Sequence, residues 1–236
     1  MRFATLPGDH RFFTVMSLVA SVIIVAGFGG TYGARLAAGH TVPVVIHLHA
    51  LAFSAWLVLF VTQAVLAARG RLALHRRLGW LATALAGTML VLGVAAAVSA
   101  GRHGHRGLAG AEFESAGAFT LFSVLAVLAF FTLTAAALWF RAYPQAHKRL
   151  MLMSLLGALL PPGLSRLLSL MQCLEWLGGV ATLFLLVGPA WDLATRQRIH
   201  VAYVWAAFPI AATFPPFVSW LAQTRWWLGV ASEVLG

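Results

Sequence analysis

The chain has 236 residues, of which 61% are hydrophobic and only 9% are charged, and its formal net charge is +10 at pH 7. Several uncharged apolar runs exceed the roughly 18 residues that indicate a bilayer span, which excludes an ordinary soluble domain. Most basic residues lie in short loops between these runs, where they set topology and meet anionic lipid, so we assign no nucleic-acid partner.

The apolar runs predict an all-α fold, a polytopic transmembrane helical bundle of about seven helices in a single domain. Gly-rich or Arg-bearing loops separate the runs. We expect a bend in the fifth helix at Pro161 and Pro162, because proline has no N–H for the helix ladder. The predicted spans are 12–34, 41–68, 78–100, 115–140, 150–170, 173–194 and 201–223.

Charge asymmetry between the loops predicts the orientation. If the N-terminus is cytoplasmic, eleven of the 16 basic residues fall on the cytoplasmic side, where short loops retain Arg and Lys. All but one of the basic residues are Arg, which we attribute to a GC-rich bacterial genome. The sequence therefore predicts a multi-pass protein of the bacterial inner membrane, with the N-terminus inside and the C-terminus outside.

A histidine followed by two basic residues recurs where two predicted helices begin. Residues 75–78 are His-Arg-Arg-Leu, and residues 147–150 are His-Lys-Arg-Leu. The apolar stretches 52–60 and 121–130 are also alike, so the hairpins of helices 2–3 and 4–5 resemble tandem copies. A parallel repeat would place the starts of helices 3 and 5 at one depth. In the alternative, the two hairpins are not copies and are alike only because both consist of apolar helices joined by basic loops.

Two histidines at matched depth on different helices suit bis-imidazole ligation of a haem iron, which needs one nitrogen from each side of the porphyrin. We predict His75 and His147 as these ligands. In the alternative, both histidines lie in the headgroup layer and contact lipid phosphates while the basic side chains snorkel. The cations predicted to meet the haem propionates are Arg76, Arg77, Lys148 and Arg149.

On these residues the core, about 42–171, resembles the cytochrome b561-like architecture, in which four central helices carry histidine pairs on alternate helices. The resemblance implies a b-type haem and electron transfer. The fourth predicted helix contains no histidine, which limits the implied sites to one haem. The order His-x-His-Ala, Gln63, His-Arg-Arg-Leu-Gly, His-Lys-Arg-Leu-Met is also similar to bacterial multi-pass proteins, a likeness that implies no activity.

Four further histidines form a second candidate site. On a regular helix, residues 47 and 49 would lie about 200° apart and could not serve one site. If the chain is extended around 43–49, the group could bind copper or zinc, for which imidazole is a common ligand. Solvated loop histidines are the alternative. The group consists of His47, His49, His103 and His105.

Arg166 follows the proline pair and is the most intramembrane charge in the chain. We predict Glu175 as its neutralising partner, in an ion pair that closes a short re-entrant turn. The functional alternative is a contact with a quinone, a haem propionate or another anion. Gln63 is a second intramembrane polar residue, at the end of an aromatic stripe that we interpret as packing.

With only six carboxylates and neither a phosphate-binding glycine loop nor HExxH, a hydrolase is improbable. The leading hypothesis is a b-type haem or metal-binding membrane protein of respiratory electron transfer, with a respiratory complex or quinone as partner. If it is an enzyme, it is a membrane oxidoreductase or electron carrier. The second hypothesis is a non-catalytic factor that delivers metal to, or helps assemble, a respiratory enzyme. The third is a structural or transport module whose histidines contact lipid.

Overall fold

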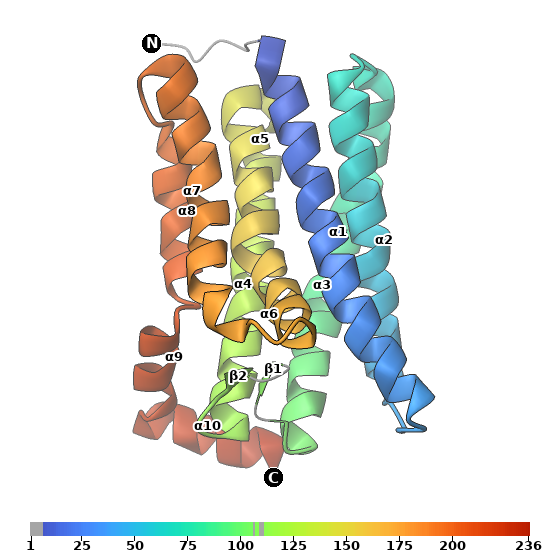
Figure 1. Ribbon diagram of the computed structural model, residues 1–236, viewed down its shortest axis with the longest axis vertical. Coiled ribbons are helices and arrows are strands. Elements are labelled where there is room, and N and C mark those ends of the chain that lie inside the picture. The colour runs from blue at the N-terminus through green and yellow to red at the C-terminus, as the bar shows by residue number, and fades with distance from the viewer. Residues whose placement is uncertain (1–6, 106, 109–110) are drawn as a thin grey trace.

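The computed structural model describes residues 7–105, 107–108 and 111–236 (Figure 1). Six of its helical segments are long and apolar enough to cross a membrane, and a bent helix pair near the C-terminus makes a seventh if the pair is one span. The prediction of an all-helical polytopic bundle is therefore confirmed. Arg2 and Arg106, which entered the charge count, lie outside the described residues.

The long helices alternate in direction along the chain, which creates two ends (Figure 1). The upper end holds the starts of α1, α3 and α5 and the end of α7, whereas the lower end holds the C-terminus. The helices are α1 (Pro7–Ala37), α2 (Val44–Ala68), α3 (Leu72–Arg102), α4 (Ala116–Trp139), α5 (Pro144–Met153), α6 (Leu160–Leu170), α7 (Leu177–Arg196), α8 (Val201–Ala211), α9 (Pro215–Ala222) and α10 (Arg225–Leu235).

Short elements join these helices. The strands β1 (Gly107–Leu108) and β2 (Ala111–Glu112) pair antiparallel at the lower end. The turns η1 (Phe140–Ala142) and η3 (Leu174–Trp176) are 3-10 helices, and η2 (Ser154–Leu159) is a π-helix.

The observed helices extend beyond the predicted spans at several ends. The third begins at Leu72 and not at residue 78, so His75 lies in its first turn. The apolar pattern marks only the part of a helix that faces hydrocarbon, whereas the backbone stays helical through the basic interface. The predicted span 201–223 is two helices with a 40° bend, because Pro215 and Pro216 cannot donate to the helix ladder.

The bend expected at Pro161 and Pro162 is replaced by a π turn within a single span, Pro144–Leu170. The two prolines cannot donate to the carbonyls one turn earlier, and η2 ends two residues before Pro161. The Leu160 N–H bonds to the Leu155 carbonyl, the five-residue spacing of a π-helix. The helix axis therefore continues across the proline pair.

Helix α1 packs closely against α6 in the lower half of the bundle. A Cβ added at Gly27 would lie 2.0 Å from the Gly163 carbonyl oxygen, so the two backbones touch at this crossing. Small residues permit such close approach between membrane helices. Large buried side chains such as Trp56, Met89 and Phe130 belong to the same core cluster as the residues of this crossing.

Candidate functional site

The structure brings the two repeated histidines together at the upper end. His75 lies on α3 and His147 on α5, and their ring centroids are 6.3 Å apart with an interplanar angle of 88°. The two residues are 72 positions apart in the chain, and neither helix alone could assemble the pair. The expectation that both histidines lie at one depth is therefore met.

Each ring directs one nitrogen at a backbone carbonyl. His75 Nδ1 lies 3.2 Å from the Gln63 carbonyl oxygen, and His147 Nδ1 lies 2.8 Å from that of Ala137. Because a carbonyl only accepts, Nδ1 is the donor in both rings, and in a neutral imidazole this leaves the lone pair on Nε2. Metal-binding histidines are commonly oriented by this kind of second contact.

Gln63 takes part in the same arrangement. Its side-chain Nε2 donates to the His75 carbonyl oxygen at 3.0 Å, while its own carbonyl accepts from the His75 ring. This reciprocal pair joins α2 to the first turn of α3 and fixes the direction of the His75 ring. Gln63, interpreted from the sequence as the end of a packing stripe, is thus a positioning residue for His75.

The four cations predicted for the propionates separate into two groups. Arg76 and Arg77 are exposed and, with Ala73 and Trp80, line an open cavity of about 270 Å³. Lys148 and Arg149 are instead engaged in ion pairs. The structure leaves only Arg76 and Arg77 for the predicted contact with propionates.

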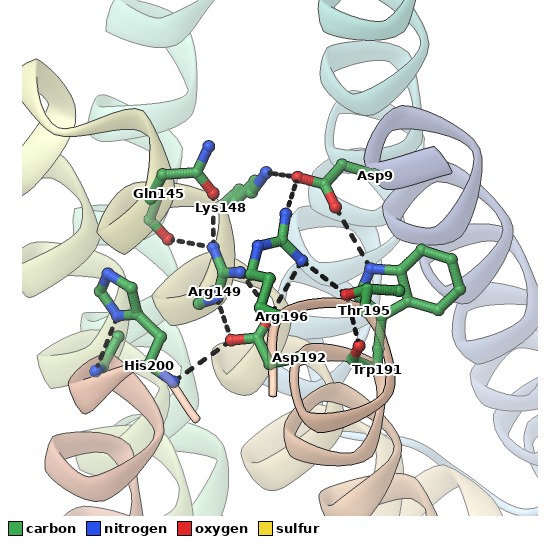
Figure 2. A network of polar contacts seen from close by, with 10 residues as sticks. Asp9, Gln145, Lys148, Arg149, Trp191, Asp192, Thr195, Arg196 and His200 are labelled. Carbon is green, nitrogen blue, oxygen red and sulfur yellow. Dashed lines mark hydrogen bonds and ion pairs between the residues drawn. The ribbon is translucent and has the colours of Figure 1, made fainter. Parts of the chain in front are cut away.

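These ion pairs form a buried network that joins α1, α5 and α7 (Figure 2). Arg149 binds Asp192 in a bidentate manner, and both side chains are 0% exposed. Lys148 Nζ contacts Asp9 Oδ2 at 2.6 Å. Arg196 contacts both carboxylates, and its Nη1 lies 3.3 Å from Asp192 Oδ1. Buried charges of this kind persist only where opposite charges and hydrogen bonds compensate for lost water.

Neutral groups complete the network. Arg149 Nη1 donates to the Gln145 side-chain oxygen at 2.7 Å, and Trp191 Nε1 donates to Asp9 Oδ1 at 3.2 Å. The His200 backbone N–H donates to Asp192 Oδ2 at 3.3 Å. The polar side chains thereby lock the helix that carries His147 against its neighbours.

Comparison with known proteins adds no relative. No family model, curated protein or solved structure matches this chain. The resemblance to cytochrome b561-like proteins therefore stays a prediction based on the histidine pattern alone.

The second group of histidines is not assembled. Helix α2 begins at Val44, so the extended chain that would let residues 47 and 49 chelate jointly is absent. Among residues 7–105, 107–108 and 111–236, no three His, Cys, Asp or Glu side chains are placed to hold a metal. Each histidine has a separate neighbour: Tyr32 hydroxyl for His47, the Phe53 ring for His49, the Ser99 carbonyl for His103 and Arg35 for His105.

His105 shows how charge at the lower end affects an imidazole. Its Nε2 lies 3.1 Å from Arg35 Nη1. Burial, together with the Arg35 guanidinium, lowers the pKa of the His105 ring below its usual value. The neutral ring then accepts a hydrogen bond from Arg35.

The predicted pair of Arg166 and Glu175 is wrong. None of the ion pairs within the described part of the chain includes either residue. The Arg166 guanidinium lies over the Phe28 ring, 4.2 Å from its centroid, and Nη1 donates to the Pro162 carbonyl at 2.9 Å. The re-entrant turn is also absent, because the helices before and after it are both long enough to span. Arg166 therefore faces α1.

Proposed function

We propose that this multi-pass membrane protein is an electron-transfer protein in which His75 and His147 bind a b-type haem. The proposal depends on one observation. The two rings come from different helices, and their centroids lie 6.3 Å apart. Both rings direct Nδ1 at a backbone carbonyl, so the Nε2 atoms of neutral rings are left to bind one iron atom.

The number of ligands favours haem over a bare metal ion. A protein-bound zinc ion takes four ligands, and even its catalytic sites take three from the protein. The described residues offer no such group of three or more. A haem iron requires only two axial ligands, because the porphyrin supplies the others. An imidazole pair without further ligands suits that requirement.

The residues around the pair fit this role in part. Arg76 and Arg77, exposed beside the cavity at the start of α3, are available for the propionates. Lys148 and Arg149 bind carboxylates of the protein and are not. A bound haem would supply one-electron chemistry, while the Gln63 and Ala137 carbonyls keep the rings oriented and their Nδ1 atoms protonated.

We also propose that the upper end faces the cytoplasm of a bacterium, in its inner membrane. This end carries exposed Arg69 and Arg71 between α2 and α3, and exposed Arg76 and Arg77 near the start of α3. This density of arginine in short loops is typical of cytoplasmic loops.

Absorbance spectroscopy tests the haem. We expect the protein purified from haem-replete cells to show a Soret band, and replacing either ligand, in His75→Gln or His147→Gln, to remove the band. His10→Gln is the matched control, because His10 is exposed on α1 at the same end. Metal analysis of the same sample tests binding of copper or zinc.

Two results would overturn this assignment. A wild-type protein without a Soret band, although haem is supplied, excludes the haem. A band that survives in both single variants places the ligands elsewhere. In either case the T-shaped contact of the two rings is packing between α3 and α5, which is the alternative that the same distance allows.

A further inference from the structure

Helix α10 leaves the direction of the bundle. Figure 1 shows it running across the lower end, whereas the long helices run from one end to the other. It has 11 residues, and a transmembrane helix needs about 20. Its start is defined by a cap, because the Thr224 hydroxyl accepts a hydrogen bond from the Trp227 N–H at 3.3 Å. Helix α10 is therefore a separate surface helix and not the end of a span.

One face of α10 is fixed against the bundle. The buried Trp227 donates from Nε1 to the Gly117 carbonyl at the start of α4, at 3.2 Å. Arg102, the last residue of α3, donates from Nε to the Val234 carbonyl at 2.8 Å. A Cβ added at Gly117 would lie 3.4 Å from the Cβ of Ala231. Because Trp227 and Ala231 lie one turn apart on the same face, these contacts fix the rotation of α10 about its axis.

The remaining surface of α10 divides into apolar sides and a polar outer face. Each residue turns a helix by about 100°, so Trp226 and Leu228 lie on either side of the packed Trp227. Trp226 is 65% exposed and Leu228 is 55% exposed. This pattern is typical of a helix in a membrane surface, with apolar side chains in contact with lipid and a polar face in water. Three exposed polar residues lie farther around the axis, about 120–160° from Trp227: Arg225, Ser232 and Glu233.

The exposed apolar surface of α10 follows an exposed aromatic surface on the two preceding helices. On α9, Trp220 is 63% exposed, and its ring centroid lies 5.6 Å from that of Phe217. On α8, Trp205 and Phe208 are each 67% exposed. Helices α8 and α9 form the bent pair that can make one membrane crossing, whose exposed rings face lipid. Large exposed apolar surfaces mark interaction sites, and the bilayer that covers α8 and α9 extends to α10.

We propose that α10 lies in the lipid–water interface at the lower end of the bundle, with Trp226 and Leu228 inserted between the lipid headgroups. Tryptophan is enriched at this depth, because its ring is apolar and its N–H donates to polar groups. The partner is the bilayer itself, and the outer face of α10 stays in water. The helix thereby anchors the end of α3 and the start of α4 at the membrane surface. This proposal is independent of the haem.

Electron paramagnetic resonance of the full chain in phosphatidylcholine vesicles tests this position. Cys173 is the only cysteine, so a Cys173→Ala background accepts one nitroxide label, at Trp226→Cys, Leu228→Cys or Ser232→Cys. The label at 232, on the outer face, is the matched control. Oxygen concentrates in the bilayer, whereas a nickel chelate stays in water. We expect the ratio of oxygen to nickel relaxation to be severalfold higher at 226 and 228 than at 232.

The three labels decide between lipid, water and a second copy of the chain. A ratio higher than that at 232 supports the interfacial position, whereas equal ratios at all three positions overturn it. Spin–spin broadening at 226 or 228 that persists when the protein is diluted in lipid also overturns it, because a second copy then covers this surface. If Trp226→Cys fails to fold, the comparison of Leu228→Cys with Ser232→Cys carries the test.

Discussion

The two ends of the bundle treat buried charge in opposite ways. At the upper end, Lys148, Arg149 and Arg196 lie against the carboxylates of Asp9 and Asp192. At the lower end, the guanidinium of Arg166 lies against an aromatic ring and α1 meets α6 through bare backbone. The upper cations are neutralised by carboxylates of neighbouring helices and hold those helices together, whereas Arg166 has no carboxylate partner among the described residues and contacts a ring and a backbone carbonyl.

The largest expected effect comes from breaking the neutralised end. Asp192→Asn keeps the shape of the side chain but leaves Arg149 buried without its carboxylate. Removing one partner of a buried pair costs about 3–5 kcal/mol, so we expect a much lower unfolding temperature in detergent. The control is Glu233→Gln, exposed on α10, for which a change of about 0.5 kcal/mol or less is expected. Equal stability of the two variants would show that the pair contributes nothing.

At the lower end, the stability of the protein should depend on the size of the side chains where α1 crosses α6, rather than on their charge. In Gly27→Ala, the new methyl group would collide with the Gly163 carbonyl of α6. Such overpacking costs about 1–3 kcal/mol, measurable as a lower unfolding temperature. Gly29→Ala is the matched control, because nothing lies within 4 Å of its added Cβ. A Gly27→Ala variant as stable as this control would mean that the helices cross farther apart.

The smallest expected effect is a pH dependence of stability that comes from His200, at the edge of the charged network. Burial, and then the Arg149 guanidinium, lower the pKa of His200 from its ordinary 6.5. As pH falls, the unfolded chain takes up this proton before the folded one, so stability decreases between 6.5 and the lowered pKa. The neutral Nδ1 also accepts from the Ala202 N–H as a helix cap, worth about 1 kcal/mol.

Replacing the titrating ring tests this dependence. His200→Asn retains a capping oxygen without titration, so we expect it to lose less stability than the wild type between about pH 7.5 and about pH 5.5. His10→Asn, on an exposed surface of α1, should behave as the wild type does. If His200→Asn shows the wild-type pH profile in thermal unfolding, His200 does not titrate differently on folding.

The helices and the histidine pair were accessible from the sequence, because hydropathy marks spans and the repeat marks His75 and His147. The charged network was not. No sequence pattern singles out Asp9 or Asp192, although carboxylates are scarce enough in this chain to draw attention at helix ends. Asp9 and Arg196 are separated by 187 positions, so only the helix arrangement determines their pairing. Sequence proximity suggested Glu175 for Arg166, whereas the rotation of α6 points that residue at α1.

That rotation follows from the π turn, Ser154–Leu159, which separates His147 from Arg166 along one continuous span. A π turn holds one residue more than a regular turn, so the residues after it lie about 100° around the axis from where an unbroken α-helix of the same sequence would place them. Deleting one residue here would convert the π turn into a regular turn and leave Arg166 facing α1, whereas a regular α-helix through all six residues would turn Arg166 away from it. The direction of Arg166 relative to His147 therefore depends on one extra residue that the π turn accommodates.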